Sequence, residues 1–224
     1  MSTAKLAERA AAHLHFLCDH LPTRAVGSQG NRNATTYAAE VCRAAGWQVE
    51  TPTFQCMAWD ENGADLAAGS AVFEVFAGPY TLPAHVSAPL VVLNTIEDLE
   101  GADLTGKVVL LCGDLTKNQL APKNFPWWNP EEHQRIIAAL EKASPLAILA
   151  ATTRNPETAG AVYPFPLIED GDFDIPSAYM TEEEGQRLAV YAGREIDLEI
   201  RARRTSSEGC NVVARKGGSG LTGN

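Results

Sequence analysis

Histidine side chains are the first candidates for metal chemistry, because imidazole is a common zinc ligand. The chain has five histidines, and none of them forms an H-E-x-x-H motif. His13 and His20 can share one helix face beside Asp19. Since a zinc site needs three or four convergent ligands, the pattern favours solvated helix histidines, and we expect no metal-binding residue in this chain.

Serine and cysteine nucleophiles lack a supporting motif. An α/β-hydrolase carries G-x-S-x-G at a sharp strand-to-helix turn, and Ser219 misses this pattern by one residue. The five cysteines lie far apart, form no C-x-x-C pair and stand in no motif that would activate a thiol. We therefore expect no catalytic residue here. The thiols expected to be buried and reduced are Cys18, Cys42, Cys56, Cys112 and Cys210.

Two further segments satisfy part of a ligand-binding motif. Residues 218–223 read G-x-G-x-x-G after a predicted strand, but a dinucleotide site also needs a helix after the glycines, and the sequence goes only as far as Asn224. Residues 169–174 hold four acids without the spacing of an EF-hand. They indicate an acidic surface turn, with a calcium site as the alternative. We expect no cofactor in this chain.

Two rigid aromatic loops carry the strongest binding signal. They read Phe-Pro-Trp-Trp over 125–128 and Tyr-Pro-Phe-Pro over 163–166. Aromatic side chains on a loop either form a recognition surface or tuck into the core. The candidate substrate-binding residues are Phe125, Trp127, Trp128 and Tyr163.

Composition excludes several partners. The formal charge is -10, which argues against nucleic acid or an anionic membrane surface. With 45 % hydrophobic residues, the chain can bury a real core. No apolar run approaches the ~20 residues of a membrane span, and the first residues lack a signal-peptide core. We expect a cytoplasmic protein and leave its oligomeric state open.

The chain opens with a predicted helix, helix and strand. Apolar residues at intervals of three and four over 6–21 form one stripe of a first helix, which Pro22 ends. A second helix is predicted over 34–45, and residues 47–54 alternate as a strand.

From about Cys56 the pattern changes to short β-like runs separated by Gly, Pro and Asn. One helix is predicted to be capped by Asn129 with Pro130 in its first turn, and another begins with a capping box at Thr181. The apolar run 146–151 predicts a strand covered on both faces. The other predicted strands are 71–76, 88–93, 107–111, 195–203 and 211–216. Together these elements predict an α/β fold.

The two ends of the chain resemble the two-zinc aminopeptidase family. Residues 24–28 match an R-x-x-G-S entry turn, 47–50 resemble the first sheet strand, and Asn-Val-Val-Ala at 211–214 resembles the second. We expect Gly27 and Ser28 to shape and cap the turn into the second helix rather than to contact substrate.

The middle of the chain resembles a protease-associated (PA) domain. Leu-Thr-Gly-Lys-Val-Val-Leu-Leu at 104–111 is similar to the D-L-x-G-K-I-V-L signature of such domains, and residues 145–149 and 173–177 are similar to their later strands. The resemblance implies a β-rich PA domain with flanking helices, inserted into an incomplete α/β zinc-exopeptidase domain. The implied boundaries are 1–55 and 205–224 for the peptidase pieces and 56–204 for the PA domain.

This arrangement requires the strands at 47–54 and 211–216 to pair, so that the ends of the insert lie close together. In the resembled family, zinc ligands come from an H-x-D motif on the strand after N-V-V-A and from later positions, none of which is present here. The resemblance implies two zinc ions in the full-length parent and no hydrolysis by this chain alone. The PA domain would cover the active site and restrict or bind peptide.

Three functional hypotheses follow. The first is a fragment of a zinc aminopeptidase whose partners are a peptide substrate or the missing catalytic domain. The second is a stand-alone PA module that binds a peptide or protein. The third, a nucleotide-dependent enzyme, rests only on the glycine-rich tail.

Overall fold

The structure is a computed structural model of the 224-residue chain. It divides into two compact units, each described by itself. The first unit is Met1–Trp59 with Thr205–Asn224, and the second unit is Asp60–Arg204. The residues that the structure describes are 3–21, 23–123, 125–152 and 174–218.

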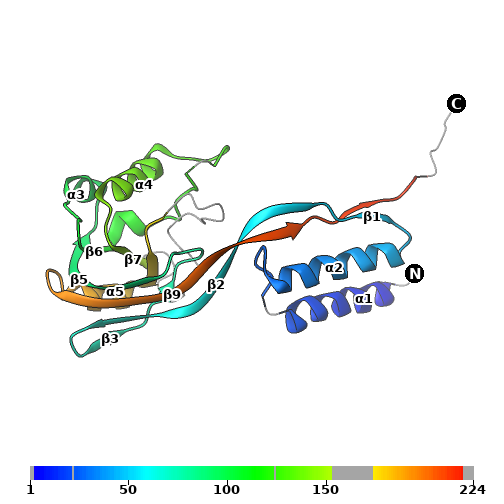
Figure 1. Ribbon diagram of the computed structural model, residues 1–224, viewed down its shortest axis with the longest axis horizontal. Helices are drawn as coiled ribbons and strands as arrows, with labels where there is room; N and C mark the ends of the chain where they lie inside the picture. The colour runs from blue at the N-terminus through cyan, green and yellow to red at the C-terminus, as the bar shows by residue number, and fades with distance from the viewer. Residues whose placement is uncertain (1–2, 22, 124, 153–173, 219–224) are drawn as a thin grey trace. The chain divides into compact units, whose positions relative to one another are not determined.

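Two helices form the first part of the first unit (Figure 1). α1 spans Thr3–His15 and continues as a π-helical turn, Phe16–His20, which confirms the first predicted helix. α2 spans Gln29–Ala44, so the prediction of a start at residue 34 was wrong. The helix begins earlier because the Ser28 hydroxyl accepts the Asn31 N–H (3.0 Å), which confirms the predicted cap.

The apolar stripe predicted on the first helix is largely uncovered. No residue of α1 or of the π-helical turn is buried among the described residues, and α2 buries only Ala39. The two helical segments meet at Tyr37, whose ring stacks on that of Phe16 with centroids 4.1 Å apart and whose hydroxyl lies 2.6 Å from His13 Nδ1. Sequence periodicity therefore predicted the helix but not its surroundings.

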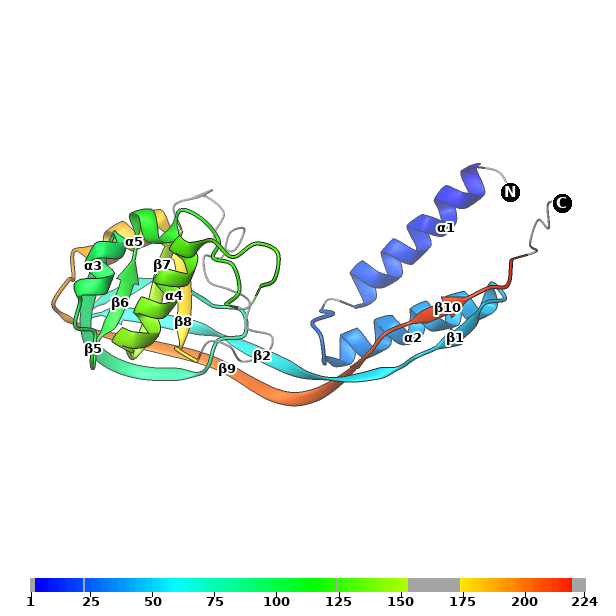
Figure 2. The same ribbon diagram turned by 90° about the horizontal axis from the view of Figure 1, so that it is seen from above.

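The predicted pairing of the two distant strands is confirmed. β1, Gln48–Glu50, pairs antiparallel with β10, Val213–Arg215, and Val49 lies opposite Ala214. The strand predicted over 47–54 breaks before Pro52, whose carbonyl accepts the Asn211 N–H (3.0 Å). α2 lies along this two-stranded ribbon (Figure 2).

An eight-stranded mixed sheet has the strand order β3-β2-β9-β5-β6-β7-β8-β4. β5 to β8 are parallel neighbours, and antiparallel strands flank them. This mixed sheet with its helices confirms the predicted α/β class. The strand bounds are β2 Thr53–Ala68, β3 Ala71–Phe73, β4 Phe76–Ala77, β5 Ala84–Leu93, β6 Val108–Leu111, β7 Ala147–Thr152, β8 Ser177–Thr181 and β9 Glu195–Cys210.

Two strand predictions need correction. The run 71–76 is not one strand, because its residues belong to β3 and β4, which lie at opposite ends of the sheet order. Glu74 and Val75 separate the two strands, and the Glu74 N–H donates to the Glu184 carboxylate (3.0 Å). The strand predicted over 195–203 continues to Cys210 because β2 lies beside it in the sheet, a non-local pairing that supports polar, turn-forming residues in extended conformation.

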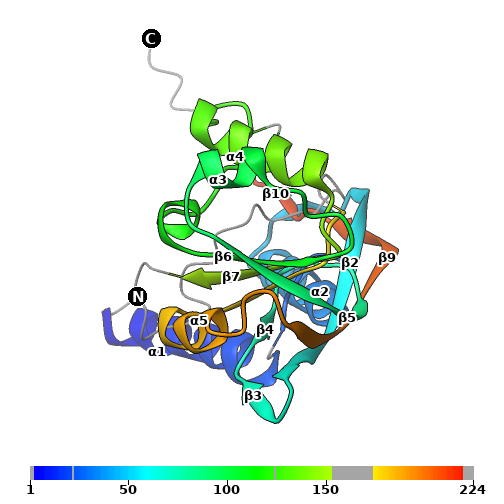
Figure 3. The same cartoon turned by 90° about the vertical axis from the view of Figure 1, so that its left-hand side faces the viewer.

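Helices cover both faces of the parallel strands in the second unit (Figure 3). α3, Ile96–Gly101, and α4, Glu131–Ala143, lie on one face, and α5, Glu182–Ala189, lies on the other. The Thr181 hydroxyl accepts the Glu184 N–H (3.2 Å), which confirms that cap. A Cβ at Gly185 would overlap the Cβ of Ala151, so α5 approaches the sheet closely.

The start of α4 differs from the prediction. Pro130 occupies the N-cap position in an extended conformation, and no side chain caps the helix. The Asn129 amide instead donates to the Lys123 carbonyl (2.7 Å). Asn129 therefore fixes the preceding loop and not the helix end.

The core of the second unit lies between the sheet and these helices. Every residue of β6 and β7 is buried, which confirms the strand predicted to be covered on both faces. The largest fully buried side chains are Leu66, Leu90, Leu99, Leu104, Leu110, Leu111, Ile137, Leu140, Ile148 and Leu149.

Candidate aromatic binding surface

Three predicted substrate-binding residues present their rings to solvent in the second unit. The exposed fraction is 87 % for Trp127, 55 % for Trp128 and 39 % for Phe125. We call these three side chains the aromatic surface. Large apolar groups normally leave water on folding, so an ordered set of exposed rings marks a candidate recognition surface. The fourth candidate, Tyr163, lies outside the described residues, as does the rest of 163–166.

The rings are arranged by short local contacts. Phe125 and Trp127 meet edge to face, with centroids 5.7 Å apart and planes at 86°. The Phe125 N–H donates to the Pro122 carbonyl (3.0 Å), which closes a tight turn before the aromatic residues. Trp127 therefore contacts the neighbouring Phe125 ring while most of its own surface remains in water.

Polar contacts connect α4 to both ends of residues 125–128, which we call the aromatic segment. The Asn129 amide binds the Lys123 carbonyl, and the Lys123 ammonium pairs with the Glu141 carboxylate (2.6 Å). The Gln134 amide donates to the Asn129 carbonyl (2.8 Å). Gln134 and Glu141 lie about two turns apart on α4, so the helix supports the loop at two points.

A buried histidine forms the base of the surface. His133 is only 6 % exposed, and its Nδ1 accepts the N–H of Ala121 (3.0 Å). Its ring meets the Trp128 ring edge to face, with centroids 5.0 Å apart and planes at 88°. Burial lowers the pKa of His133; the Glu132 carboxylate opposes this shift, and the Lys117 ammonium adds to it.

Sequence reasoning missed His133 as a component of the site. A signal was present, because His133 shares a helix face with Ile136, Ile137 and Leu140, all buried. A histidine on an apolar helix face is expected to be buried and to need a hydrogen-bond partner. The partner, a backbone N–H from Ala121, could not be read from the spacing.

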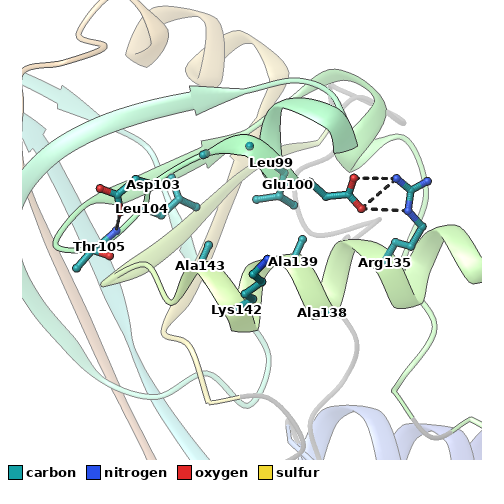
Figure 4. A pocket seen from close by; sticks show the side chains of 12 residues that line it. Leu99, Glu100, Asp103, Leu104, Thr105, Arg135, Ala138, Ala139, Lys142 and Ala143 are labelled. Carbon is teal, nitrogen blue, oxygen red and sulfur yellow. Dashed lines mark hydrogen bonds and ion pairs between the residues drawn. The ribbon is translucent and has the colours of Figure 1, made fainter.

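A groove between α3 and α4 is a second feature that the sequence did not reveal (Figure 4). Its volume is about 610 Å³, and its apolar lining includes Leu99, Leu104 and Ala139. The Arg135 guanidinium binds the Glu100 carboxylate in bidentate fashion (2.9–3.1 Å) at its edge. Two hydrogen bonds from Thr105 lower the pKa of Asp103; the one from the backbone N–H contributes most, and the one from the side chain contributes less.

The groove suits binding more than catalysis. The charges of Arg135 and Glu100 neutralise each other. The Asp103 carboxylate accepts a hydrogen bond from the Thr105 N–H (3.1 Å). Among the described lining residues there is no serine, cysteine or histidine that would act as a nucleophile or base.

The other sequence candidates lie elsewhere. His13 Nδ1 is 2.6 Å from the Tyr37 hydroxyl. Within residues 3–21, 23–123, 125–152 and 174–218, no group of three His, Cys, Asp or Glu side chains could hold a metal ion. Of the acidic turn 169–174, only Asp174 is described, and it pairs with Arg204 (2.7 Å). The glycine-rich tail from residue 219 lies outside the described residues.

The cysteines are free, but the expected burial was wrong. Cys18 is exposed because it lies on the uncovered π-helical turn, and the other four are half-buried. Burial raises the pKa of the Cys112 thiol to about 11, with a smaller contribution from Glu182. A thiol with such a pKa is a poor nucleophile at neutral pH. No helix in the described part of the chain is long and apolar enough to cross a membrane.

Solved structures share this fold. An aminopeptidase from Aneurinibacillus sp. strain AM-1 matches with a TM-score of 0.62 and 22 % identity, over 94 % of this chain and 49 % of that one. A zinc aminopeptidase from Bacillus subtilis matches with a TM-score of 0.67 and 17 % identity, over 96 % and 48 %. A peptidase M28 precursor from Shewanella amazonensis SB2B matches with a TM-score of 0.60 and 17 % identity, over 93 % and 52 %.

At these identities the likeness shows the fold. This chain spans about half the length of each of the three neighbours. No family model matches the sequence, and no curated protein matches it in sequence.

Proposed function

We propose that this chain is the substrate-selecting part of a zinc aminopeptidase, in which residues 56–204 are a PA domain carried between peptidase pieces 1–55 and 205–224. The observation that supports this most is the fold likeness to zinc aminopeptidases over nearly the whole chain. The pairing of β1 with β10 agrees with it, because it joins the two pieces that flank the insert.

The proposed role of the PA domain is to cover the active site and to bind or restrict peptide. The aromatic surface is the part of this unit best suited to contact a peptide, since exposed Trp and Phe rings bind apolar side chains with little loss of conformational entropy. Tyr163 is proposed as a further substrate-binding residue.

Catalysis is assigned to other parts of the parent enzyme. Two zinc ions would activate water and polarise the peptide carbonyl there. The described residues of this chain do not fit such a centre, because they bring no three metal-binding side chains together. No hydrolytic step is therefore attributed to them.

Peptide titration of the whole chain tests the role of the aromatic surface. A Gly-Ser octapeptide with two phenylalanines should bind, and its counterpart with two alanines should not. Trp127→Ala should raise the Kd about tenfold, since an exposed aromatic contact contributes about 1.4 kcal/mol. Calorimetry provides the measurement.

Trp47→Ala is the matched control, because Trp47 is also exposed (41 %) but lies outside the aromatic surface. It should leave the Kd unchanged. An equal loss in both variants would refute a specific aromatic site. A large loss of stability in Trp127→Ala would instead indicate a core role for Trp127.

A stand-alone peptide-binding module is the second candidate. It is favoured because the second unit has a core of its own and also carries the aromatic surface. The genomic reading frame after codon 224 distinguishes the two. A strand with an H-x-D motif within about 20 residues, the length of one βα step, supports the peptidase, and its absence supports the module.

A further inference from the structure

His133 connects two parts of the chain that border the aromatic surface. It lies in the first turn of α4, and Ala121 lies before the aromatic segment. The hydrogen bond between His133 Nδ1 and the Ala121 N–H is buried, since Ala121 is only 1 % exposed. The chain between these two residues contains Phe125, Trp127 and Trp128.

This hydrogen bond fixes the protonation state of the ring. A ring nitrogen accepts a hydrogen bond only when it carries no proton, so Nδ1 is unprotonated and the neutral ring carries its proton on Nε2. A second proton on the ring would occupy Nδ1 and remove the acceptor. The Ala121 N–H would then be buried without a partner, which is unfavourable.

Trp128 connects His133 to the aromatic surface by direct ring contact. Its ring packs edge to face against the imidazole, and about half of its own surface remains in water. A change in the position of the imidazole therefore shifts a ring that belongs to the aromatic surface.

We infer that His133 is a positioning residue that holds the aromatic surface in its peptide-binding arrangement while the imidazole is neutral, and releases it when the imidazole is protonated. The link to peptide binding rests on the proposed function. The release of the loop between Ala121 and His133, which we call the loop transition, does not rest on the proposed function, because it follows from the loss of the Ala121 hydrogen bond.

The charges around His133 partly cancel. Glu132 on α4 favours the protonated ring and Lys117 disfavours it, but the Lys117 ammonium lies 3.3 Å from the Glu132 carboxylate and 3.6 Å from that of Asp114. Burial remains the main influence, and it lowers the pKa of His133.

The direction of the pH effect follows from that shift. An unfolded histidine has a pKa of about 6.5, and the folded value lies below it. The unfolded or released chain therefore binds the proton more readily. The contribution of His133 to loop stability is fully present above about pH 6.5 and is lost as the pH falls through the lowered folded value.

Nuclear magnetic resonance of the whole chain between pH 8 and 5 tests the transition directly. At pH 7.5 the ring nitrogens of His133 should show an unprotonated Nδ1. As His133 titrates, the Ala121 amide should lose protection from hydrogen exchange, and the Trp128 indole signal should shift with the same midpoint. The amides of Leu110 and Ile148 in the core strands should remain protected throughout, which separates loop release from global unfolding.

Two variants serve as controls. His133→Asn places an amide oxygen near the position of Nδ1, so it can accept the Ala121 N–H at every pH, and the Ala121 and Trp128 signals should become independent of pH. His85→Gln removes an exposed histidine of β5 and should leave the titration unchanged. A protonated Nδ1 at pH 7.5, or a titration of His133 without a change at Ala121, overturns the inference, and the wild-type chain alone decides this.

Peptide affinity gives the functional consequence. The Kd for the phenylalanine octapeptide should rise from pH 7.5 to pH 5.5 by at most about tenfold, because a released histidine with a pKa of about 6.5 shifts the equilibrium by no more than that one pH unit below its pKa. In His133→Asn the Kd should not change with pH. An unaltered wild-type Kd at pH 5.5, despite protonation, would contradict the positioning role. A chain that binds no peptide at pH 7.5 but shows the resonance titration would refute the proposed function and retain the loop transition.

Discussion

The two units of this protein contain different amounts of buried apolar surface. All ten of the largest fully buried side chains lie in the second unit, between Leu66 and Leu149. In the first unit, α1 buries no described residue and α2 buries Ala39 alone. Burial of apolar surface contributes roughly 25 cal/mol per Å², so it dominates the stability of the second unit. The first unit depends more on helix caps, strand pairing and aromatic contacts.

This difference suggests a division of roles. A unit with its own core can hold the loop that carries the aromatic surface in a defined position, because the supporting helix α4 is anchored by Ile136, Ile137 and Leu140. The first unit presents apolar side chains such as Leu6 and Leu14 to solvent. Such faces are typical of surfaces that contact another protein segment.

The largest expected effect comes from a pair of identical substitutions in the two units. Leu110→Ala removes a fully buried side chain and should lower the free energy of unfolding of the second unit by about 2–5 kcal/mol. Leu14→Ala truncates a side chain that is 63 % exposed, and it should change the free energy of unfolding of the first unit by less than about 0.5 kcal/mol. Urea denaturation followed by circular dichroism measures both values. Equal losses would show that the units do not differ in this way.

A smaller effect is expected from removing one helix cap in each unit. Ser28→Ala and Thr181→Ala each delete a hydroxyl that accepts a backbone N–H, a loss of about 0.5–2 kcal/mol. Hydrogen exchange of the first-turn amides should increase more in α2 than in α5, because α5 also packs tightly against β7 through Gly185. A larger increase in α5 would mean that tertiary packing contributes less there than the structure indicates.

The smallest expected effect is that of zinc. Because the described residues bring no three metal ligands together, added zinc or a chelator should leave the melting temperature of the chain unchanged. Calorimetric titration provides the direct measurement. Tight binding of two zinc ions would contradict the assignment of catalysis to other parts of the enzyme, and the His13, Asp19 and His20 region would be the first place to examine.

Local signals in the sequence were sufficient for most helices and for the central strands. The capping box at Thr181 and the wholly apolar run before Thr152 predicted an element type that the structure confirms. The β1–β10 pairing, which the family resemblance implied, was predicted, but prediction failed where the bounds of a strand depend on another distant segment. The extension of β9 to Cys210 requires β2 beside it, and residues 71–76 divide between β3 and β4, which have different partners at opposite ends of the sheet order.

The candidate site shows the same limit. Phe125, Trp127 and Trp128 could be selected from the sequence because they are aromatic residues in a rigid loop, but core packing is the commoner arrangement of such residues, and only the structure showed their exposure. The groove between α3 and α4 could not be found, since its two walls are separate in sequence and meet only in the folded unit.

The sequence by itself determined the α/β class, the caps of α2 and α5, and which loops carry aromatic side chains, because these depend on neighbouring residues and on periodicity. Only the tertiary structure decided that the aromatic rings face water, that His133 accepts a hydrogen bond from Ala121, and that α1 lacks cover among the described residues. The physical reason is that exposure and hydrogen-bond partnership depend on which distant segments the chain brings together, and local residue preferences do not contain that information.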